Sequence, residues 1–104
     1  MLKWFAVFDP NETKDYYRDW TAEMDAINDT IETVIFSVTT PDSGLAVQDQ
    51  AVAATQKIAV VWFTADDVNK LTAKAGKYIT IDHTIATVGG RVYNETLGLK
   101  IKEK

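Results

Sequence analysis

The sequence contains no cysteine among its 104 residues. This absence excludes a disulfide framework, a thiolate nucleophile and a zinc site built on thiolates, and it agrees with a reducing compartment. Clusters of lysine and arginine are also lacking, because the formal net charge is −4 and only the last residues, Lys100, Lys102 and Lys104, are rich in basic side chains. Binding to nucleic acid needs such clusters to neutralise phosphates, so we expect no nucleic-acid partner.

Long hydrophobic runs are missing as well. The apolar N-terminal run, residues 2–8, stops at Asp9 and Pro10 and is not followed by the small-residue cleavage site of a secretory signal. No run approaches the roughly 20 residues that a membrane span requires. We therefore expect no membrane partner.

Motifs for catalysis or cofactor binding are equally scarce. The acidic residues do not follow the spacing of a calcium loop, and any acidic sequence offers carboxylate pairs of the kind that a glycosidase uses. The glycine pair Gly89–Gly90 belongs to a hairpin and not to a phosphate-binding turn between a strand and a helix. We expect no catalytic residue, no metal site and no cofactor.

What the sequence does contain is a succession of short strands separated by turns. Its hydrophobic fraction of 46% and charged fraction of 25% are ordinary for a globular protein, and its length predicts a single domain over residues 1–104. Alternating side chains indicate a strand over residues 30–40. Residues 58–63 contain no polar side chain before Thr64, which predicts a central strand buried on both faces, with Trp62 in the core.

These strands predict an all-β fold, namely an immunoglobulin-like antiparallel β-sandwich of about seven or eight strands. We expect at most one short helix, near residues 64–75, with Thr64 followed by Asp67 as a weak N-cap signal and Gly76 at its end. Residues 21–29 include good helix formers, but the segment is too short to hold a helix unaided. It is predicted to be a loop with at most one helical turn.

Residues 77–102 predict a β-hairpin. A two-residue turn would place the isoleucines of the first strand beside polar residues or glycine, whereas a three-residue loop over residues 88–90 places them opposite apolar residues. A one-residue slip exchanges the faces of a strand, so the apolar match selects the three-residue loop. Such a loop needs a left-handed residue at its last position, which Gly90 supplies. The matched pairs are Ile85 with Tyr93, Ile81 with Leu97 and Ile79 with Leu99.

The same register places His83, the only histidine, opposite Glu95. In a structural interpretation the two form a cross-strand pair worth about 0.2–1 kcal/mol. In a functional interpretation His83 is a general base or a metal ligand, which requires a nucleophile, a second acid or further ligands within reach. The nearest candidates, Asp82 and Thr84, point to the opposite face, so the structural interpretation is favoured.

Tyr78 begins the first strand of this hairpin, shortly after Leu71 and Gly76. A leucine and a glycine before a tyrosine that starts a strand are typical of a tyrosine corner, in which the hydroxyl bonds a backbone group upstream and pins the crossover between two sheets. The alternative is that Tyr78 is an ordinary strand aromatic. The sequence leaves both interpretations open.

The chain resembles a family of small bacteriophage structural proteins, the fibre–tail adaptors. The segments that carry the resemblance are "DPNETKDYYRDW", "NDTIETVIFSV", "SGLAV", "IAVVWF", "AGKYITIDHTI" and "GGRVYNETLGLKI". They cover nearly the whole chain. The sequence departs from the family in "TADDVNKLTAKAG", where members usually have a shorter connection rich in glycine and threonine.

The resemblance implies an immunoglobulin-like sandwich that serves the architecture of the virion without catalysis. We expect an adaptor that is made in the host cytoplasm and joins the tail or neck to fibres by protein–protein docking. Its partners would be other virion proteins, in a symmetric assembly of several copies. The alternatives are a capsid decoration protein and a module that binds carbohydrate or the host surface through exposed aromatic side chains.

The N-terminal segment, residues 2–8, is the first candidate for the docking contact. Trp4 and Phe5 are adjacent, so in a strand they point to opposite faces and one sheet face cannot bury both. Phe8 adds an aromatic side chain before the turn, and Trp20 is a further candidate. The alternative is that this segment lies in the domain's own core.

Overall fold

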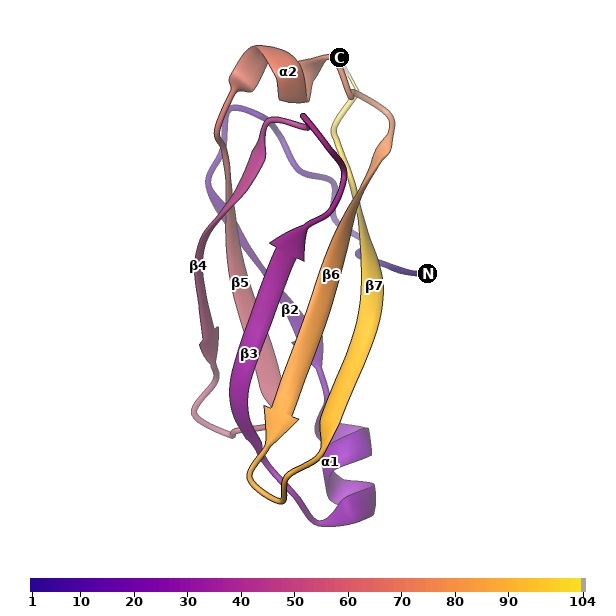
Figure 1. Ribbon diagram of the computed structural model, residues 1–104. Coiled ribbons are helices and arrows are strands. Elements are labelled where there is room, and N and C mark those ends of the chain that lie inside the picture. The colour runs from indigo at the N-terminus through magenta and orange to yellow at the C-terminus, as the bar shows by residue number, and fades with distance from the viewer. Residues whose placement is uncertain (104) are drawn as a thin grey trace.

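A computed structural model describes residues 1–103, which form two β-sheets packed face to face, with a short helix near each end (Figure 1). The described part is elongated, with principal extents of 44 × 22 × 21 Å. In chain order the elements are β1 (Leu2–Lys3), β2 (Lys14–Asp19), α1 (Thr21–Ile27), β3 (Ile31–Val38), β4 (Leu45–Val52), β5 (Ile58–Ala65), α2 (Val68–Thr72), β6 (Tyr78–Thr87) and β7 (Val92–Lys100).

The order of the strands is that of an immunoglobulin-like sandwich. One sheet has the order β1-β7-β6-β3 and the other has the order β2-β5-β4. Strands β2, β5 and β4 correspond to B, E and D of the immunoglobulin fold, and β3, β6 and β7 correspond to C, F and G. The predicted all-β sandwich is therefore confirmed, and all its pairings are antiparallel except that of β1, which runs parallel to β7.

The core lies between the two sheets and is formed by alternate residues of each strand. β6 shows this most clearly, because Ile79, Ile81, His83 and Ile85 are all fully buried. The prediction for residues 58–63 was wrong in one respect. Only one face of β5 is buried, and Trp62 is 40% exposed on the outer face, since each sheet of a two-layer sandwich presents its other face to solvent.

The predicted strand over residues 30–40 is β3, and it contains a bulge between Ile31 and Thr33. The bulge explains how apolar residues that do not alternate regularly fit one strand. The extra residue lets Ile31 face the core, as Phe36 does, while Ile35 is left exposed on the outer face.

The register of the β6–β7 hairpin is confirmed. The ladder pairs Ile85 with Tyr93 and His83 with Glu95, and it closes at Ala86 and Val92. The loop turns at Gly90, whose φ is +87°. The other two predicted pairs, Ile81–Leu97 and Ile79–Leu99, are also present.

The substitution Gly90→Val should lower the free energy of unfolding by about 1–2 kcal/mol, because a β-branched side chain resists a positive φ. A Cβ atom at this position would meet no heavy atom within 4 Å, so the backbone conformation is the only source of the loss. Urea unfolding followed by circular dichroism measures the change. Gly90→Asn is the matched control and should lose less, since asparagine tolerates the left-handed region; equal losses for the two variants would contradict this explanation.

The expectation of at most one helix was wrong, because residues 21–29 contain α1, which spans two turns. Met24 anchors it with a side chain that is fully buried, and Asn28 ends it in the left-handed conformation with φ +51°. The carboxylate of Asp19 accepts a hydrogen bond from the amide of Thr21 at 2.9 Å and so satisfies one free donor of the first turn. The packing of one buried side chain thus stabilises a helix that is too short to form alone.

The second helix, α2, is the one predicted near residues 64–75, but it begins at Val68 and ends at Thr72, so the predicted end at Gly76 was wrong. Asp67 caps its start by accepting a hydrogen bond from the amide of Lys70 at 3.1 Å, and Leu71 buries its side chain over the end of the sandwich.

Tyr78 follows this helix but does not form a tyrosine corner. Its hydroxyl makes no hydrogen bond within residues 1–103, and its half-exposed ring lies under the Lys3 Nζ atom, 4.5 Å from the ring centroid.

Candidate functional site

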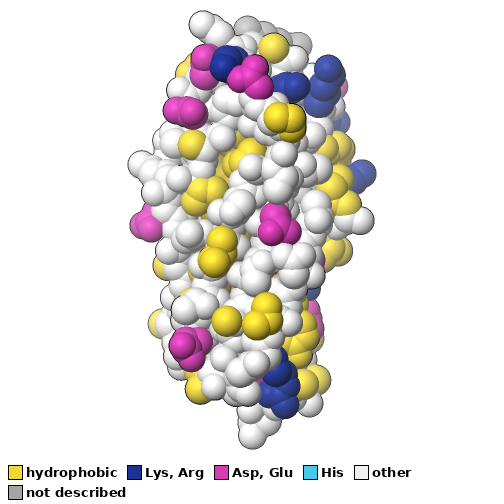
Figure 2. Space-filling model, viewed as in Figure 1, with side chains coloured by type: hydrophobic (Ala, Val, Ile, Leu, Met, Phe, Trp, Pro, Cys, Tyr) yellow, Lys and Arg dark blue, Asp and Glu magenta, His cyan; other side chains and the backbone are white. Residues whose placement is uncertain are grey.

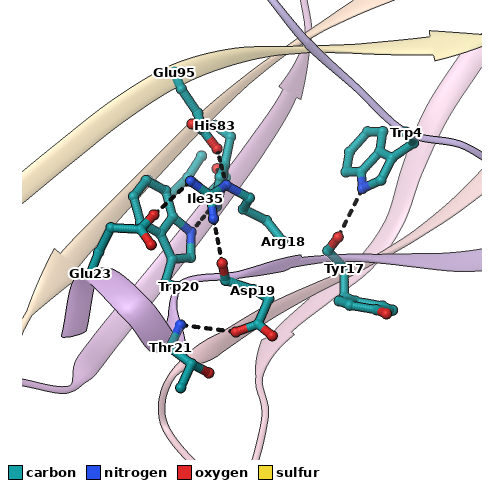
Figure 3. Close-up of polar contacts among 10 residues, drawn as sticks. All are labelled: Trp4, Tyr17, Arg18, Asp19, Trp20, Thr21, Glu23, Ile35, His83 and Glu95. Carbon is teal, nitrogen blue, oxygen red and sulfur yellow. Dashed lines mark hydrogen bonds and ion pairs between the residues drawn. The ribbon is translucent and has the colours of Figure 1, made fainter. Parts of the chain in front are cut away.

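His83 is held between the two sheets by three contacts, and Figure 3 shows those with Trp20 and Ile35. Its Nε2 atom accepts a hydrogen bond from the Trp20 indole at 3.1 Å, and its Nδ1 atom lies 3.1 Å from the carbonyl oxygen of Ile35. Its ring stacks on Phe36 with a centroid distance of 3.9 Å and an interplanar angle of 9°. The side chain is fully buried.

These contacts define the protonation state of the ring. The Trp20 indole N–H can only donate, so Nε2 must accept, and Nδ1 therefore carries the proton that is donated to Ile35. Burial lowers the pKa of His83, although the hydrogen bond to Ile35 and the charge of Glu95 oppose the shift. The imidazole is thus neutral at physiological pH, with both nitrogen atoms occupied.

The carboxylate of Glu95 does not bind His83, although the two residues are opposite each other in the ladder. It binds the guanidinium of Arg18, with a distance of 2.6 Å from Nε to the carboxylate oxygen, and the same guanidinium contacts Glu23 at 2.8 Å. Arg18 also lies over the indole of Trp20, 4.0 Å from the ring centroid (Figure 3). The predicted His83–Glu95 side-chain pair is therefore replaced by a bridge from β2 to β7, because a stronger cation competes for the carboxylate.

This cluster lacks the parts of a catalytic or metal site. No nucleophile adjoins His83 in its hydrogen-bonded contacts, and no group of three or more histidine, aspartate or glutamate side chains is placed to hold a metal ion in the described residues. A polar hollow at the far end of the sandwich contains Asp42 and Lys70, which form an ion pair with each other. The contacts of His83 are those of a side chain packed between the two sheets.

The N-terminal segment is tied to the sandwich at both ends but departs from it in the middle. Of residues 2–8, only Leu2 and Lys3 form a strand. The chain then bends at residues 5 and 6, and Phe8 forms an isolated parallel β-bridge with Ile101. The bend breaks the ladder because Trp4 turns inward between the sheets.

Two aromatic contacts anchor this segment. The ring of Trp4 packs 5.3 Å from that of Tyr16 and 5.7 Å from that of Phe63, and its indole donates to the carbonyl oxygen of Tyr17 at 2.8 Å (Figure 3). The Tyr16 hydroxyl donates to the carbonyl oxygen of Val7 at 2.9 Å, and burial, assisted by the charge of Glu12, raises the pKa of Tyr16 to about 12. Tyr16 therefore stays neutral and keeps its proton for this bond.

Phe5 projects from the bend and is fully exposed, at 106% of its reference area. A hollow of about 390 Å³ lies beside it, between the N-terminal segment and β2, and Tyr17 on its rim is also exposed. We call this region the N-terminal surface; it is lined by Lys3, Trp4, Phe5, Ala6, Lys14, Asp15, Tyr16 and Tyr17. Exposed apolar surfaces of this kind are typical of sites where proteins bind one another.

The rest of the visible surface offers less. Figure 2 shows the face formed by β3, β6 and β7, where hydrophobic side chains are scattered singly among polar atoms. Charged side chains gather toward the two ends of the molecule, and hydrophobic ones are more frequent along the margin on which the N-terminus lies. Single apolar side chains scattered in this way are normal on a protein surface and need no partner.

Of the four residues predicted to bind a partner, two line the N-terminal surface and two are buried in the core. Phe5 is exposed and Trp4 is partly buried, and both line the N-terminal surface. Phe8 and Trp20 belong to the core, with 0% and 4% exposure. The core alternative therefore holds for these two side chains, because each fills space between the sheets.

Several residues of the N-terminal surface were missed in the sequence. Tyr17 carried a usable signal, because Tyr16 and Tyr17 are adjacent in a strand and only one of them can face the core. The sequence contains no signal for Lys3 and Lys14. The two lysines come close to each other only because of the path that the N-terminal segment takes across β2.

No helix in residues 1–103 is long and apolar enough to span a membrane. The fold and the site together define an immunoglobulin-like β-sandwich whose distinctive feature is an exposed aromatic surface beside an edge strand. The chain belongs to the family described as podophage GP4 fiber-tail adaptor protein gp77, whose model matches residues 9–100. The resemblance stated from the sequence is thereby confirmed, and it indicates a structural role in a phage rather than a class of enzyme. No curated protein shows a significant match to the chain.

Proposed function

We propose that this protein is a single-domain adaptor of the phage virion that joins a fibre to the tail or neck by protein–protein docking. Its partners are other virion proteins, and several copies are arranged symmetrically. The observation that carries the proposal is the fully exposed Phe5 on the N-terminal surface, in a chain whose family is that of fiber-tail adaptors.

The energetic argument concerns the phenylalanine. Burying a side chain of this size contributes about 1.5–3 kcal/mol, which is a large fraction of the binding energy of a small interface. Phe5 gains none of this within residues 1–103, although Trp4 and Phe8 on either side of it are packed inward. Its side chain is therefore available as an anchor for a partner.

The substitution Phe5→Ala should reduce incorporation of the adaptor into particles by about tenfold or more while leaving the fold unchanged. Loss of an anchor residue costs about 2 kcal/mol of binding or more, whereas truncation of an exposed side chain changes stability by about 0.5 kcal/mol or less. Quantitative mass spectrometry of purified particles, produced with the variant as the sole source of the protein, measures incorporation.

Val88→Ala is the matched control, because Val88 is 60% exposed and lies in the hairpin loop away from the N-terminal surface. It should be incorporated normally. Normal incorporation of Phe5→Ala would exclude Phe5 as the anchor, and absence of the natural protein from purified particles would overturn the adaptor function.

A further inference from the structure

The two flanks of the sandwich, where the edges of its sheets lie, differ in how they are protected. On the flank formed by β3 and β4, the side chain of Gln50 accepts a hydrogen bond from the edge amide of Phe36 at 2.7 Å. Both strands also carry a bulge, between Ile31 and Thr33 in β3 and between Val47 and Asp49 in β4. Bulges and occupied amides are devices that keep an edge from pairing with another chain.

The opposite flank contains the edge of β2, which is left open over a short stretch. The amide of Trp20 donates a hydrogen bond to the carbonyl oxygen of Lys57, on the side of β2 that faces β5. The carbonyl oxygen of Tyr17 points to the other side of β2, where it accepts a hydrogen bond from the Trp4 indole. The N–H and C=O groups of successive residues in an antiparallel strand point to alternate sides. The backbone groups of Asp15 and Tyr17 therefore both point to the open edge of β2. No backbone hydrogen bond joins residues 4–7 to β2 in the part of the chain described. The N–H and C=O of Asp15 and the N–H of Tyr17 are thus available for pairing.

The open stretch coincides with the hollow of the N-terminal surface, which is flanked by two cations. The Nζ atoms of Lys3 and Lys14 lie 4.5 Å and 5.6 Å from the centroids of the Tyr78 and Tyr16 rings. Neither lysine forms an ion pair within residues 1–103. Asp15 is the only carboxylate in the lining. On a protein with a net charge of −4, the lining of this hollow therefore carries an excess of positive charge around an apolar floor.

We propose that an extended segment of another virion protein adds to the open edge of β2 at Asp15 and Tyr17, with acidic side chains against Lys3 and Lys14 and an apolar side chain in the hollow. Backbone pairing supplies affinity in this mode of recognition, and the side-chain contacts supply selectivity. Charge complementarity favours an acidic segment over a second copy of this chain, because β2 itself carries both signs of charge. The inference rests on the proposed adaptor function and specifies the partner's chemistry.

Photo-cross-linking in assembled particles tests where the partner lies. A benzophenone amino acid in place of Tyr17 should cross-link to an extended, acidic segment of a different virion protein, which mass spectrometry of the linked peptides identifies. The same amino acid in place of Val92 is the control, since Val92 is exposed to a similar extent, at 68% against 62%, and lies on the β6–β7 hairpin. A cross-link from position 17 to a second copy of this chain, to a helix or to nothing would overturn the proposal.

Hydrogen exchange tests the backbone pairing itself. The amides of Asp15 and Tyr17 should exchange at least about tenfold more slowly in assembled particles than in the isolated protein, because pairing protects an edge amide. Docking through side chains alone would leave both amides exchanging at the isolated rate, which would overturn strand addition.

Charge reversal tests the acidic character of the segment. The double substitution Lys3→Glu, Lys14→Glu should reduce incorporation into particles by about tenfold or more, since like charges at an interface repel. Lys74→Glu, Lys77→Glu makes the same change in net charge near α2 and should reduce incorporation by less than about twofold. Equal effects of the two pairs would overturn the charge argument. Particles that contain the adaptor with unprotected β2 amides overturn this inference alone, whereas particles without the adaptor overturn the proposed function as well.

Discussion

Deletion of residues 1–8, with a new initiator methionine, should leave a chain that is largely unfolded at 37 °C. Phe8 is fully buried and Trp4 packs between the sheets against Tyr16 and Phe63. Removal of one large buried aromatic side chain costs about 3–5 kcal/mol, and a domain of this size has a total stability of about 5–15 kcal/mol. Loss of both anchors therefore removes most of the free energy of unfolding.

Urea unfolding followed by far-ultraviolet circular dichroism measures this loss, since the fluorescence of Trp4 disappears with the deletion. Phe8→Ala should reproduce a large part of it, whereas Phe5→Ala, three residues earlier and exposed, should not change the midpoint. A truncated chain with the midpoint of the full chain would show that the segment is a detachable docking element and no part of the core.

The substitution His83→Ala should lower the free energy of unfolding by about 2–4 kcal/mol. It leaves a cavity beside Phe36 and deprives the buried Trp20 indole of its acceptor. Thermal and urea unfolding measure the loss. Val88→Ala, in the exposed hairpin loop, is the control and should be nearly neutral. A neutral His83→Ala would show that the cluster contributes no packing energy.

The same histidine should make stability depend on pH in a defined window. Because the pKa of His83 is lowered in the folded chain, the unfolded chain binds more protons as the pH falls below about 6.5, and stability declines there with a slope of at most about 1.4 kcal/mol per pH unit. The charged groups that act on the ring are Glu95 and Arg18, and Asp82 from the opposite face of β6. Ordinary carboxylates titrate near pH 4, below this window.

Unfolding measured between pH 7.5 and 5 tests this dependence. His83→Phe keeps a ring on Phe36 but cannot take up a proton, so its stability should be almost constant over this interval while that of the natural chain falls. A natural chain with constant stability down to pH 5 would contradict the neutral, buried state assigned to His83. The pKa of Asp29 is lowered to about 2 by hydrogen bonds from Thr87, from the amides of Thr30 and Gly89 and from Arg91. Its contribution to stability is lost only in stronger acid, so it does not affect this test.

The hairpin could be predicted from the sequence because its information is local. Side chains in a strand alternate with a period of two, so one shift of register exchanges every apolar residue for a polar one, and Gly90 adds a turn signal at the right place. The sandwich class followed from the same short-range pattern of strands and turns.

Three features could not be predicted because they depend on contacts between distant segments. The helix α1 is stabilised by the burial of Met24, which no local propensity reveals. Trp62 faces solvent because an apolar run does not show which of its faces a second sheet covers. Glu95 binds Arg18, 77 positions away in the chain, and this choice of partner is set by the distance between β2 and β7.

The candidate site was predicted in part. The pair Trp4 and Phe5 was chosen because adjacent residues of a strand point in opposite directions, and one of them is indeed exposed. A strand through residues 2–8 would continue straight past Phe5, so the bend that exposes this side chain was not predicted. The bend follows from the inward turn of Trp4, which is a tertiary contact with Tyr16 and Phe63.

The hydrogen bond from the amide of Phe36 to the side chain of Gln50 limits the number of edges at which the molecule can pair with another strand. A β-sandwich with open edges on both flanks can add subunit after subunit and grow into filaments. Here one flank is blunted by this side chain and by two bulges, so a strand that adds to the other flank ends the growth instead of extending it. The chain therefore does not offer two open flanks along which copies of itself could polymerise.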